Sequence, residues 1–154
     1  MPDLLITFTA SVLIWFMYLG LAILWIIDGR VKREIVIHAF IAALVAWMAS
    51  LMFKDVFNTT RPYIQDGLKS LVLWMPQFEN GAFPSSHAAS SFALAVTIWF
   101  HDRKIGILYV AASLLIGLAR VLARVHYPID ILGGAVLGIL MAFLVEKIHF
   151  KFRT

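Results

Sequence analysis

The chain has 154 residues, with a hydrophobic fraction of 62%, a charged fraction of 14% and a formal net charge of +4. A soluble domain of this size is excluded, because such domains carry about 25% charged residues and could not bury so much apolar surface. Cysteine is absent, which excludes disulfides and thiolate metal sites. We therefore expect a single all-α integral-membrane domain over residues 1–154, with no nucleic-acid partner.

Five apolar segments are predicted to cross the bilayer, since a crossing needs about 20 apolar residues. The first, residues 4–27, is too long for the core of a signal peptide and no basic residue precedes it, so we interpret it as a span. A polar break at 28–34 and a tight turn at 101–104 separate neighbouring spans, and the third span is short. The other four predicted spans are residues 35–53, 85–100, 105–122 and 129–148.

The segment between the second and third spans carries apolar residues at helical spacing, with polar residues opposite them. This pattern predicts an amphipathic helix in the membrane interface, which around residues 68–75 would gate lateral entry of a lipid. A packed connector fits the pattern equally well. The apolar positions are Ile64, Leu68, Leu71, Val72 and Met75, and the polar positions are Gln65, Asp66 and Lys69.

Five crossings sort the loops onto two sides, and the side richer in Lys and Arg is expected to face the cytoplasm. One side carries Arg30, Lys32, Arg33, Arg103, Lys104, Lys147, Lys151 and Arg153, and the other carries Lys54, Arg61, Lys69, Arg120 and Arg124. The N-terminus is therefore expected outside. Six polar residues that could serve chemistry all fall on the outer side: Lys54, Arg61, His87, Arg120, His126 and Asp130.

The first polar cluster is KDVFNTTRP, residues 54–62. Ionisable side chains at membrane depth are costly and usually functional. Basic residues at helix ends also extend toward lipid headgroups, and for Lys54 alone this explanation is favoured. Pro62 imposes an extended backbone on Arg61, which indicates a positioned side chain.

The second cluster is PSSH, residues 84–87, at the start of the third predicted span. Ser85 or Ser86 can cap the helix, and capping alone would account for both serines. A helix start also offers unpaired N–H groups and the positive end of its dipole, which together can bind an anion. His87, on the first turn, would face the same anion.

The third cluster is ARVLARVHYPID, residues 119–130. Arg120 and Arg124 are one helical turn apart in sequence, so both are expected to face one region. His126 is followed by Asp130, and a carboxylate beside an imidazole fixes its tautomer and raises its basicity. The pair could equally satisfy two buried polar groups. A zinc site is discounted, because the surrounding Lys and Arg favour a bound anion.

Together these clusters resemble the three-part signature of the type-2 phosphatidic acid phosphatase superfamily, membrane lipid phosphate phosphatases. The matching elements are K-x6-RP, PSSH and R-x5-H-x3-D, in that order over residues 54–130. The resemblance implies a helical membrane bundle that dephosphorylates a membrane lipid without a metal or other cofactor. Arg side chains suit phosphate oxygens, and two histidines can supply a nucleophile and an acid near neutral pH.

The resemblance also implies roles for individual residues. His126 would be the nucleophile that forms a phosphohistidine, Asp130 would orient it, and His87 would protonate the leaving oxygen. The phosphoryl oxygens would be held by Lys54, Arg61, Arg120, Ser85 and the backbone N–H groups of Ser86 and His87.

Three positions depart from the family pattern. The family usually has glycine at Ser86, whose Cβ could crowd the phosphate or whose hydroxyl could add a hydrogen bond. It tends to have serine at Ala119, so one supporting hydrogen bond is expected to be absent. Arg124 stands where many members carry a small residue, and we hypothesise that it holds a second phosphate.

The compact layout resembles bacterial undecaprenyl-pyrophosphate phosphatases, which implies a bacterial cytoplasmic membrane with the site on its outer face. Phosphatidylglycerophosphate, phosphatidic acid and lipid A 1-phosphatases remain alternatives, and the sequence does not indicate an oligomeric state. A non-catalytic membrane protein that binds phosphate headgroups is an alternative of another class. It would need the cations but not His126 and Asp130.

Overall fold

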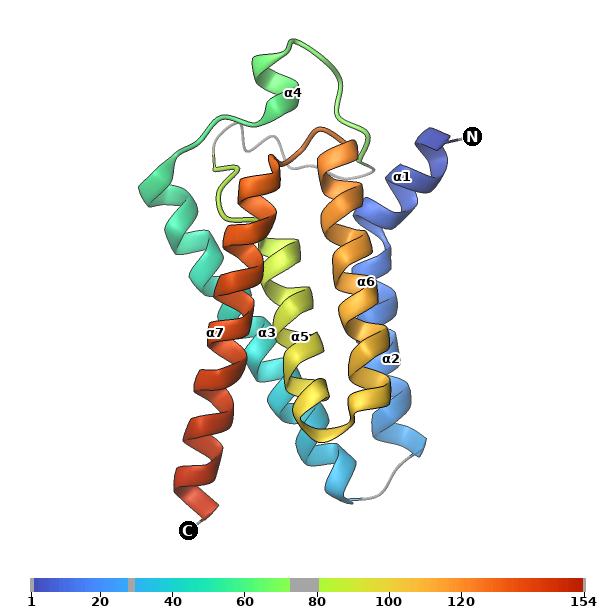
Figure 1. Ribbon diagram of the computed structural model, residues 1–154, viewed down its shortest axis with the longest axis vertical. Coiled ribbons are helices and arrows are strands. Elements are labelled where there is room, and N and C mark those ends of the chain that lie inside the picture. The colour runs from blue at the N-terminus through green and yellow to red at the C-terminus, as the bar shows by residue number, and fades with distance from the viewer. Residues whose placement is uncertain (1, 28–29, 73–80, 154) are drawn as a thin grey trace.

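The computed structural model describes residues 2–27, 30–72 and 81–153, and all the regular elements in these ranges are helices (Figure 1). The long helices pack side by side as a bundle, and the connections between them alternate between its two ends. The elements are α1 (Pro2–Ser11), α2 (Leu13–Ile27), α3 (Arg30–Phe57), α4 (Pro62–Gln65), α5 (Ser86–His101), α6 (Arg103–Leu122) and α7 (Pro128–Arg153). The predicted all-α class is confirmed.

Three helices of the described chain are long and apolar enough to cross a membrane: Arg33–Phe57, Arg103–Leu122 and Pro128–Ile148. The first predicted span is divided between α1 and α2, which are bent by 47° at Val12 and together qualify as a fourth. Helix α3 begins at Arg30, inside the predicted polar break at 28–34. Lys, Arg and Glu are good helix formers, and they continue the helix of the span that follows.

The third predicted span is the short helix α5, whose 16 residues are about 24 Å long at 1.5 Å per residue, against a hydrocarbon core of about 30 Å. Its first turn lies deeper in the bundle than the neighbouring ends of α6 and α7 (Figure 1). The expected turn at 101–104 reduces to one residue, since Asp102 ends α5 and caps α6 by accepting from the N–H groups of Lys104 and Ile105.

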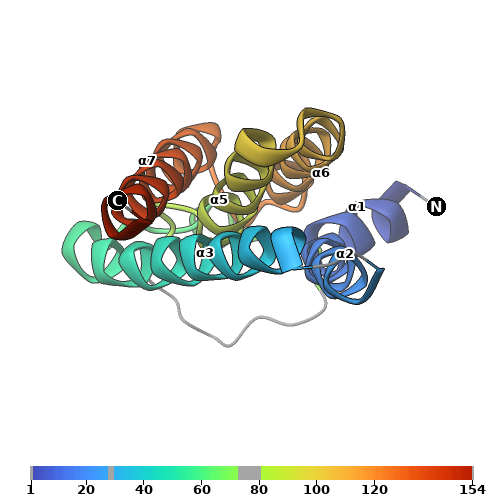
Figure 2. The same ribbon diagram turned by 90° about the horizontal axis from the view of Figure 1, so that it is seen from below.

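Helix α5 occupies the centre of the bundle, between α6 and α7 and above α3 (Figure 2). Glycines on α7 permit its close approach: a Cβ at Gly134 would lie 2.5 Å from the Ser85 carbonyl oxygen, and one at Gly138 would lie 2.2 Å from that of Ala89. Small residues of this kind let membrane helices pack backbone to backbone. The start of α5 is thereby held against the first turns of α7.

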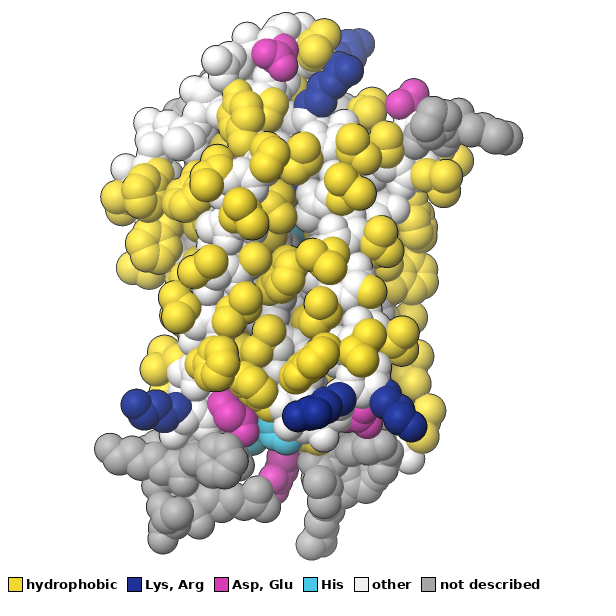
Figure 3. Space-filling model, in the orientation of Figure 1, with side chains coloured by type: hydrophobic (Ala, Val, Ile, Leu, Met, Phe, Trp, Pro, Cys, Tyr) yellow, Lys and Arg dark blue, Asp and Glu magenta, His cyan; other side chains and the backbone are white. Residues whose placement is uncertain are grey.

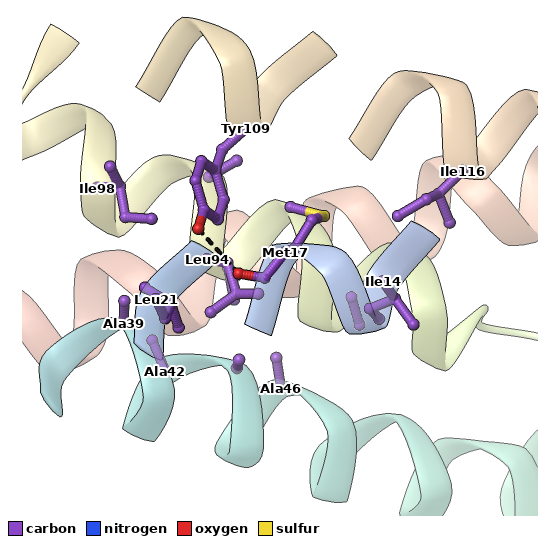
Figure 4. Close-up of a cluster of buried hydrophobic side chains, with 14 of the residues drawn as sticks. Ile14, Met17, Leu21, Ala39, Ala42, Ala46, Leu94, Ile98, Tyr109 and Ile116 are labelled. Carbon is purple, nitrogen blue, oxygen red and sulfur yellow. Dashed lines mark hydrogen bonds between the residues drawn. The ribbon is translucent and has the colours of Figure 1, made fainter. Parts of the chain in front are cut away.

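The apolar core joins α2, α3, α5 and α6 (Figure 4). Ala39, Ala42 and Ala46 of α3 face larger side chains such as Leu94, and the Tyr109 hydroxyl donates to the Met17 carbonyl oxygen at 2.8 Å. Outside this core, large apolar side chains cover the flank of the bundle, while charged ones lie toward its two ends (Figure 3). This distribution suits a lipid solvent on the flank.

The predicted interfacial helix is wrong over the part of it that the structure describes. Helix α4 ends at Gln65, and Gly67 has a φ of +65°, a left-handed conformation that stops the helix. Leu71 and Val72 then pack against a buried cluster formed by Ala10, Ala119, Ala123 and Val125. These apolar side chains serve as a packed connector, and Met75 lies outside the described residues.

Candidate active site

The start of α5 is fixed by hydrogen bonds from both directions. Ser85 is the N-cap, buried and extended, and its hydroxyl accepts from the Ala88 N–H at 3.5 Å. Its own N–H donates to the Asp130 carbonyl oxygen at 3.0 Å. The predicted cap is confirmed, and it ties the first turn of α5 to the first turn of α7, where Asp130 lies.

Two loop segments that are hydrogen-bonded to each other hold Lys54 beside this helix start. The Thr59 carbonyl oxygen accepts from the N–H groups of Gly81 and Ala82, and the Thr59 hydroxyl accepts from the Phe83 N–H at 2.8 Å. Lys54, in the last turn of α3, donates to the Gly81 carbonyl oxygen at 2.6 Å. The ammonium is therefore held by the same loop that leads into α5.

Two arginines are buried in the same region with unused donors. Arg61 is 8% exposed and donates from Nη1 to the Val125 carbonyl oxygen at 3.1 Å, while Arg120 is 5% exposed and donates from Nη1 to that of Ala10 at 3.2 Å. Nε of each guanidinium is buried without a hydrogen-bond partner in the described part of the chain. Buried cationic donors are costly unless an acceptor meets them, so this arrangement calls for an anion.

The hydrogen bond that holds Arg120 lies next to the bend in the first predicted span. Ala10 lies in the last turn of α1, where carbonyl groups lack a partner within the helix. The break at Val12 therefore exposes an acceptor that holds the guanidinium in place. Neither proline nor glycine marks residues 11–13, and the sequence carried no signal for this contact.

His126 and Asp130 lie together, both 2% exposed. Nδ1 of His126 is 3.4 Å from Oδ2 of Asp130, which is longer than a hydrogen bond but close enough to orient the ring. The same carboxylate oxygen accepts from the Tyr127 N–H at 2.8 Å, which fixes its position in the first turn of α7.

The imidazole of His126 is kept neutral by its surroundings. Burial lowers its pKa well below the usual 6.5, and the cations of Arg120, Arg61 and Lys54, followed by His87, lower it further. Burial also lowers the pKa of Arg61, against the opposing effects of Tyr63 and Asp130. Lys54, Arg61, His87 and Arg120 are all close enough to affect the pKa of His126, so the structure brings these predicted site residues into one cluster.

Two of the predicted site residues lie differently from the expectation. The Ser86 hydroxyl is hydrogen-bonded to Ser50 of α3 at 2.7 Å, so its side chain is engaged between helices. Ser50 is fully buried and also contacts the Trp47 carbonyl oxygen at 2.6 Å. Sequence reasoning missed this partner, although a serine within an apolar helix is a usable signal.

Arg124 does not continue the helix that carries Arg120. Helix α6 ends at Leu122, and Arg124 is exposed with a φ of +62°. The expectation that the two arginines stand one helical turn apart on one face is therefore wrong.

A comparison with family models matches residues 34–154 to one family, described as the PAP2 superfamily. The chain belongs to the PAP2 superfamily. The match includes every residue of the cluster around His126 and leaves out the α1–α2 segment. The resemblance indicated by the three sequence motifs is thus confirmed.

Curated PAP2 relatives include the undecaprenyl-diphosphatase BcrC of Bacillus subtilis, 29% identical over 79% of this chain and 61% of its own. The bacitracin transport permease protein BcrC of Bacillus licheniformis is 29% identical over 90% of this chain and 67% of its own. The putative undecaprenyl-diphosphatase YbjG of Escherichia coli is 30% identical over 86% of this chain and 66% of its own. The chain therefore spans about two thirds of the length of these relatives.

Two solved structures share the PAP2 fold. LpxE of Aquifex aeolicus superposes with a TM-score of 0.76 at 26% identity, covering 95% of this chain and 86% of its own. The transmembrane PAP2-type phosphatidylglycerolphosphate phosphatase of Bacillus subtilis gives 0.58 at 21% identity, covering 97% and 76%. The second likeness concerns the fold alone.

Proposed function

We propose that this chain is a lipid phosphatase that releases phosphate from a membrane lipid through a phosphohistidine at His126, without a metal. The observation that carries the proposal is the pair of buried guanidiniums with unused Nε donors in the same region as the buried His126–Asp130 pair. Cationic donors suit a phosphoryl group, and a neutral imidazole has the lone pair that a nucleophile needs.

In the first step, Nε2 of His126 attacks phosphorus while the bond from phosphorus to the leaving oxygen breaks. His87 gives its proton to that oxygen, and Asp130 stabilises the charge that develops on the ring by facing Nδ1. In the second step, His87 takes a proton from water, the water oxygen attacks phosphorus, and the phosphorus–nitrogen bond breaks. Inorganic phosphate leaves and His126 is neutral again. General acid catalysis of this kind contributes about 10²–10⁴-fold.

The phosphoryl oxygens are bound by Lys54, Arg61 and Arg120, together with the N–H groups of Ser86 and His87 at the start of α5. These N–H groups belong to the first turn of the helix, whose dipole favours negative charge. In this role Ser86 contributes its backbone N–H, and its hydroxyl is hydrogen-bonded to Ser50 of α3. Ser85 contributes by capping the turn, and its hydroxyl hydrogen remains to donate to a phosphate oxygen.

The substrate that we favour is undecaprenyl diphosphate, which would lose its terminal phosphate to give undecaprenyl phosphate. Relatives with undecaprenyl-diphosphatase in their names, at 29–30% identity, support this choice. The helical bundle would cross the bacterial cytoplasmic membrane five times, with α5 as a short crossing. The N-terminus and the site would then face outward, and the lipid tail would lie along the apolar flank.

The test is phosphate release by the purified chain from undecaprenyl diphosphate, phosphatidylglycerophosphate, phosphatidic acid and lipid A in matched detergent. We expect the highest kcat/KM on undecaprenyl diphosphate, inhibition by vanadate, and loss of activity to background in His126→Ala. Ser86→Gly, which restores the residue usual in the family, is the folded control and should retain activity. A headgroup-binding protein without catalysis would bind these lipids and release no phosphate from any of them.

A further inference from the structure

A second polar cluster lies at the end of the bundle opposite His126. It consists of His38 of α3, His101 at the end of α5 and Glu146 of α7, and one ligand atom from each lies within 4.8 Å of the other two. Figure 3 shows histidine side chains at the surface of this lower end, beside acidic ones. The mechanism proposed above uses none of these three residues.

We propose that these three side chains bind a divalent transition metal ion, Zn²⁺ in the first instance. Two imidazoles and one carboxylate form a zinc ligand set that leaves a fourth position for water. Nitrogen ligands favour zinc over magnesium or calcium, which prefer oxygen.

The geometry of His101 suits a metal ligand. Its Nδ1 lies 2.9 Å from the Thr97 carbonyl oxygen, which can only accept a hydrogen bond, so the proton sits on Nδ1. Zinc-bound histidines commonly donate their second N–H to a backbone carbonyl in this way. The other ring nitrogen, Nε2, lies 3.6 Å from Oε1 of Glu146. Two ligands of a tetrahedral zinc ion, each at about 2.0–2.2 Å, lie about 3.4 Å apart.

Glu146 provides an independent observation. Its side chain is 15% exposed, and Oε2 is buried without a hydrogen-bond partner among the described residues. A buried carboxylate oxygen without a partner is costly, and a metal ion bound beside it would offset that cost. Lys104 and Lys147 are exposed at this end, so water and salt screen their charges from the ion.

A metal ion here would join the three helices that carry site residues at their other ends: Lys54 on α3, His87 on α5 and Asp130 on α7. The ion would stabilise the bundle without touching the substrate. The inference does not depend on the proposed phosphatase activity, since metal binding is measured by itself.

The test uses the full chain, purified in detergent with a tag that lacks histidine, stripped with a chelator and titrated with ZnCl₂. We expect one Zn²⁺ per chain by elemental analysis and a higher unfolding temperature in zinc. His101→Ala and the isosteric Glu146→Gln should weaken binding by more than about 100-fold, beyond the effect of losing an outer-shell partner. His126→Ala is the matched control, a histidine at the opposite end, and should bind zinc as the wild type does.

Cobalt provides a second readout that does not depend on the folding of a variant. Co²⁺ added to the wild-type chain should give the intense visible bands of a four-coordinate site, and Zn²⁺ should remove them. Absence of zinc binding in the wild type, or binding that is unchanged in Glu146→Gln, would overturn the proposal. In either case His101 and Glu146 would be an ion pair only.

Discussion

Arg124 occupies a backbone position that favours glycine. The Arg124 N–H donates to the Val121 carbonyl oxygen at 2.9 Å, and the Val125 N–H donates to that of Arg120 at 3.2 Å. These two bonds form the Schellman motif that closes α6, whose left-handed residue is usually glycine. A side chain in this conformation costs about 1–2 kcal/mol, which explains why a small residue suits the position.

Replacing Arg124 with glycine should stabilise the chain by about 1 kcal/mol, because the left-handed strain disappears. For a chain of this size the unfolding temperature should rise by about 2–4 °C. Thermal unfolding in detergent checks this, and Arg124→Ala is the control, since it removes the same side chain but keeps the strain. If alanine stabilised as much as glycine, the effect would come from losing the charge. If Arg124→Ala lost the same fraction of the wild-type rate on a diphosphate lipid as on a monophosphate lipid, that result would count against a second-phosphate role for Arg124.

At the scale of elements, the contact between α5 and α7 sets the distance between the two halves of the site. Ser85 to His87 begin α5, and Asp130 lies in the first turn of α7 just after His126. Gly134 and Gly138 face the backbone of α5, where no side chain fits. Any group added there must separate the helices and, with them, the phosphate-binding turn and the nucleophile.

Gly138→Ala should therefore lower activity by moving α5 away from α7, although it removes no residue of the site. Its Cβ would meet the Ala89 carbonyl oxygen at 2.2 Å and the Ala93 nitrogen at 3.0 Å. Overpacking of this kind costs about 1–3 kcal/mol, and a shift of about 1 Å in the site can cost about 100-fold in rate. Val136→Ile, which adds one carbon on the lipid-facing side of the same helix, is the control for kcat and unfolding temperature. Comparable activity of Gly138→Ala and the control would show that the two helices are not held by this contact.

The all-helical class and the residues of the site could be predicted from the sequence, because both depend on local patterns. Apolar runs indicated helices, and the order of Lys54, Arg61, His87, Arg120, His126 and Asp130 indicated a phosphate site. The bend at Val12 could not be predicted, because the carbonyl beside it meets its partner Arg120 only in the folded chain, 110 residues away. The supposed interfacial helix failed because periodic apolar residues do not distinguish a surface helix from a connector that packs on Ala119 and Val125.

At the scale of the whole molecule, the two ends of the bundle differ in what they hold. The His126 cluster and the described loop residues 58–72 and 81–85 share one end with the N-terminus, while Asp102 and the end of α7 lie at the other (Figure 1). The end that holds His101 carries the larger share of the basic residues counted in the sequence, which is the arrangement of a cytoplasmic side. The orientation follows if α5 crosses the membrane despite its 16 residues.

Because the chain has no cysteine, single cysteines can report its orientation without background. Thr60→Cys, exposed in the loop beside Arg61, should react with a membrane-impermeant maleimide added to intact bacterial cells. Lys104→Cys, exposed at the start of α6, should react only after the membrane is opened. The two variants are controls for each other, because both positions are exposed and differ in the side they occupy. The reverse pattern would place the phosphate site in the cytoplasm, and labelling of both from outside would mean that α5 does not cross.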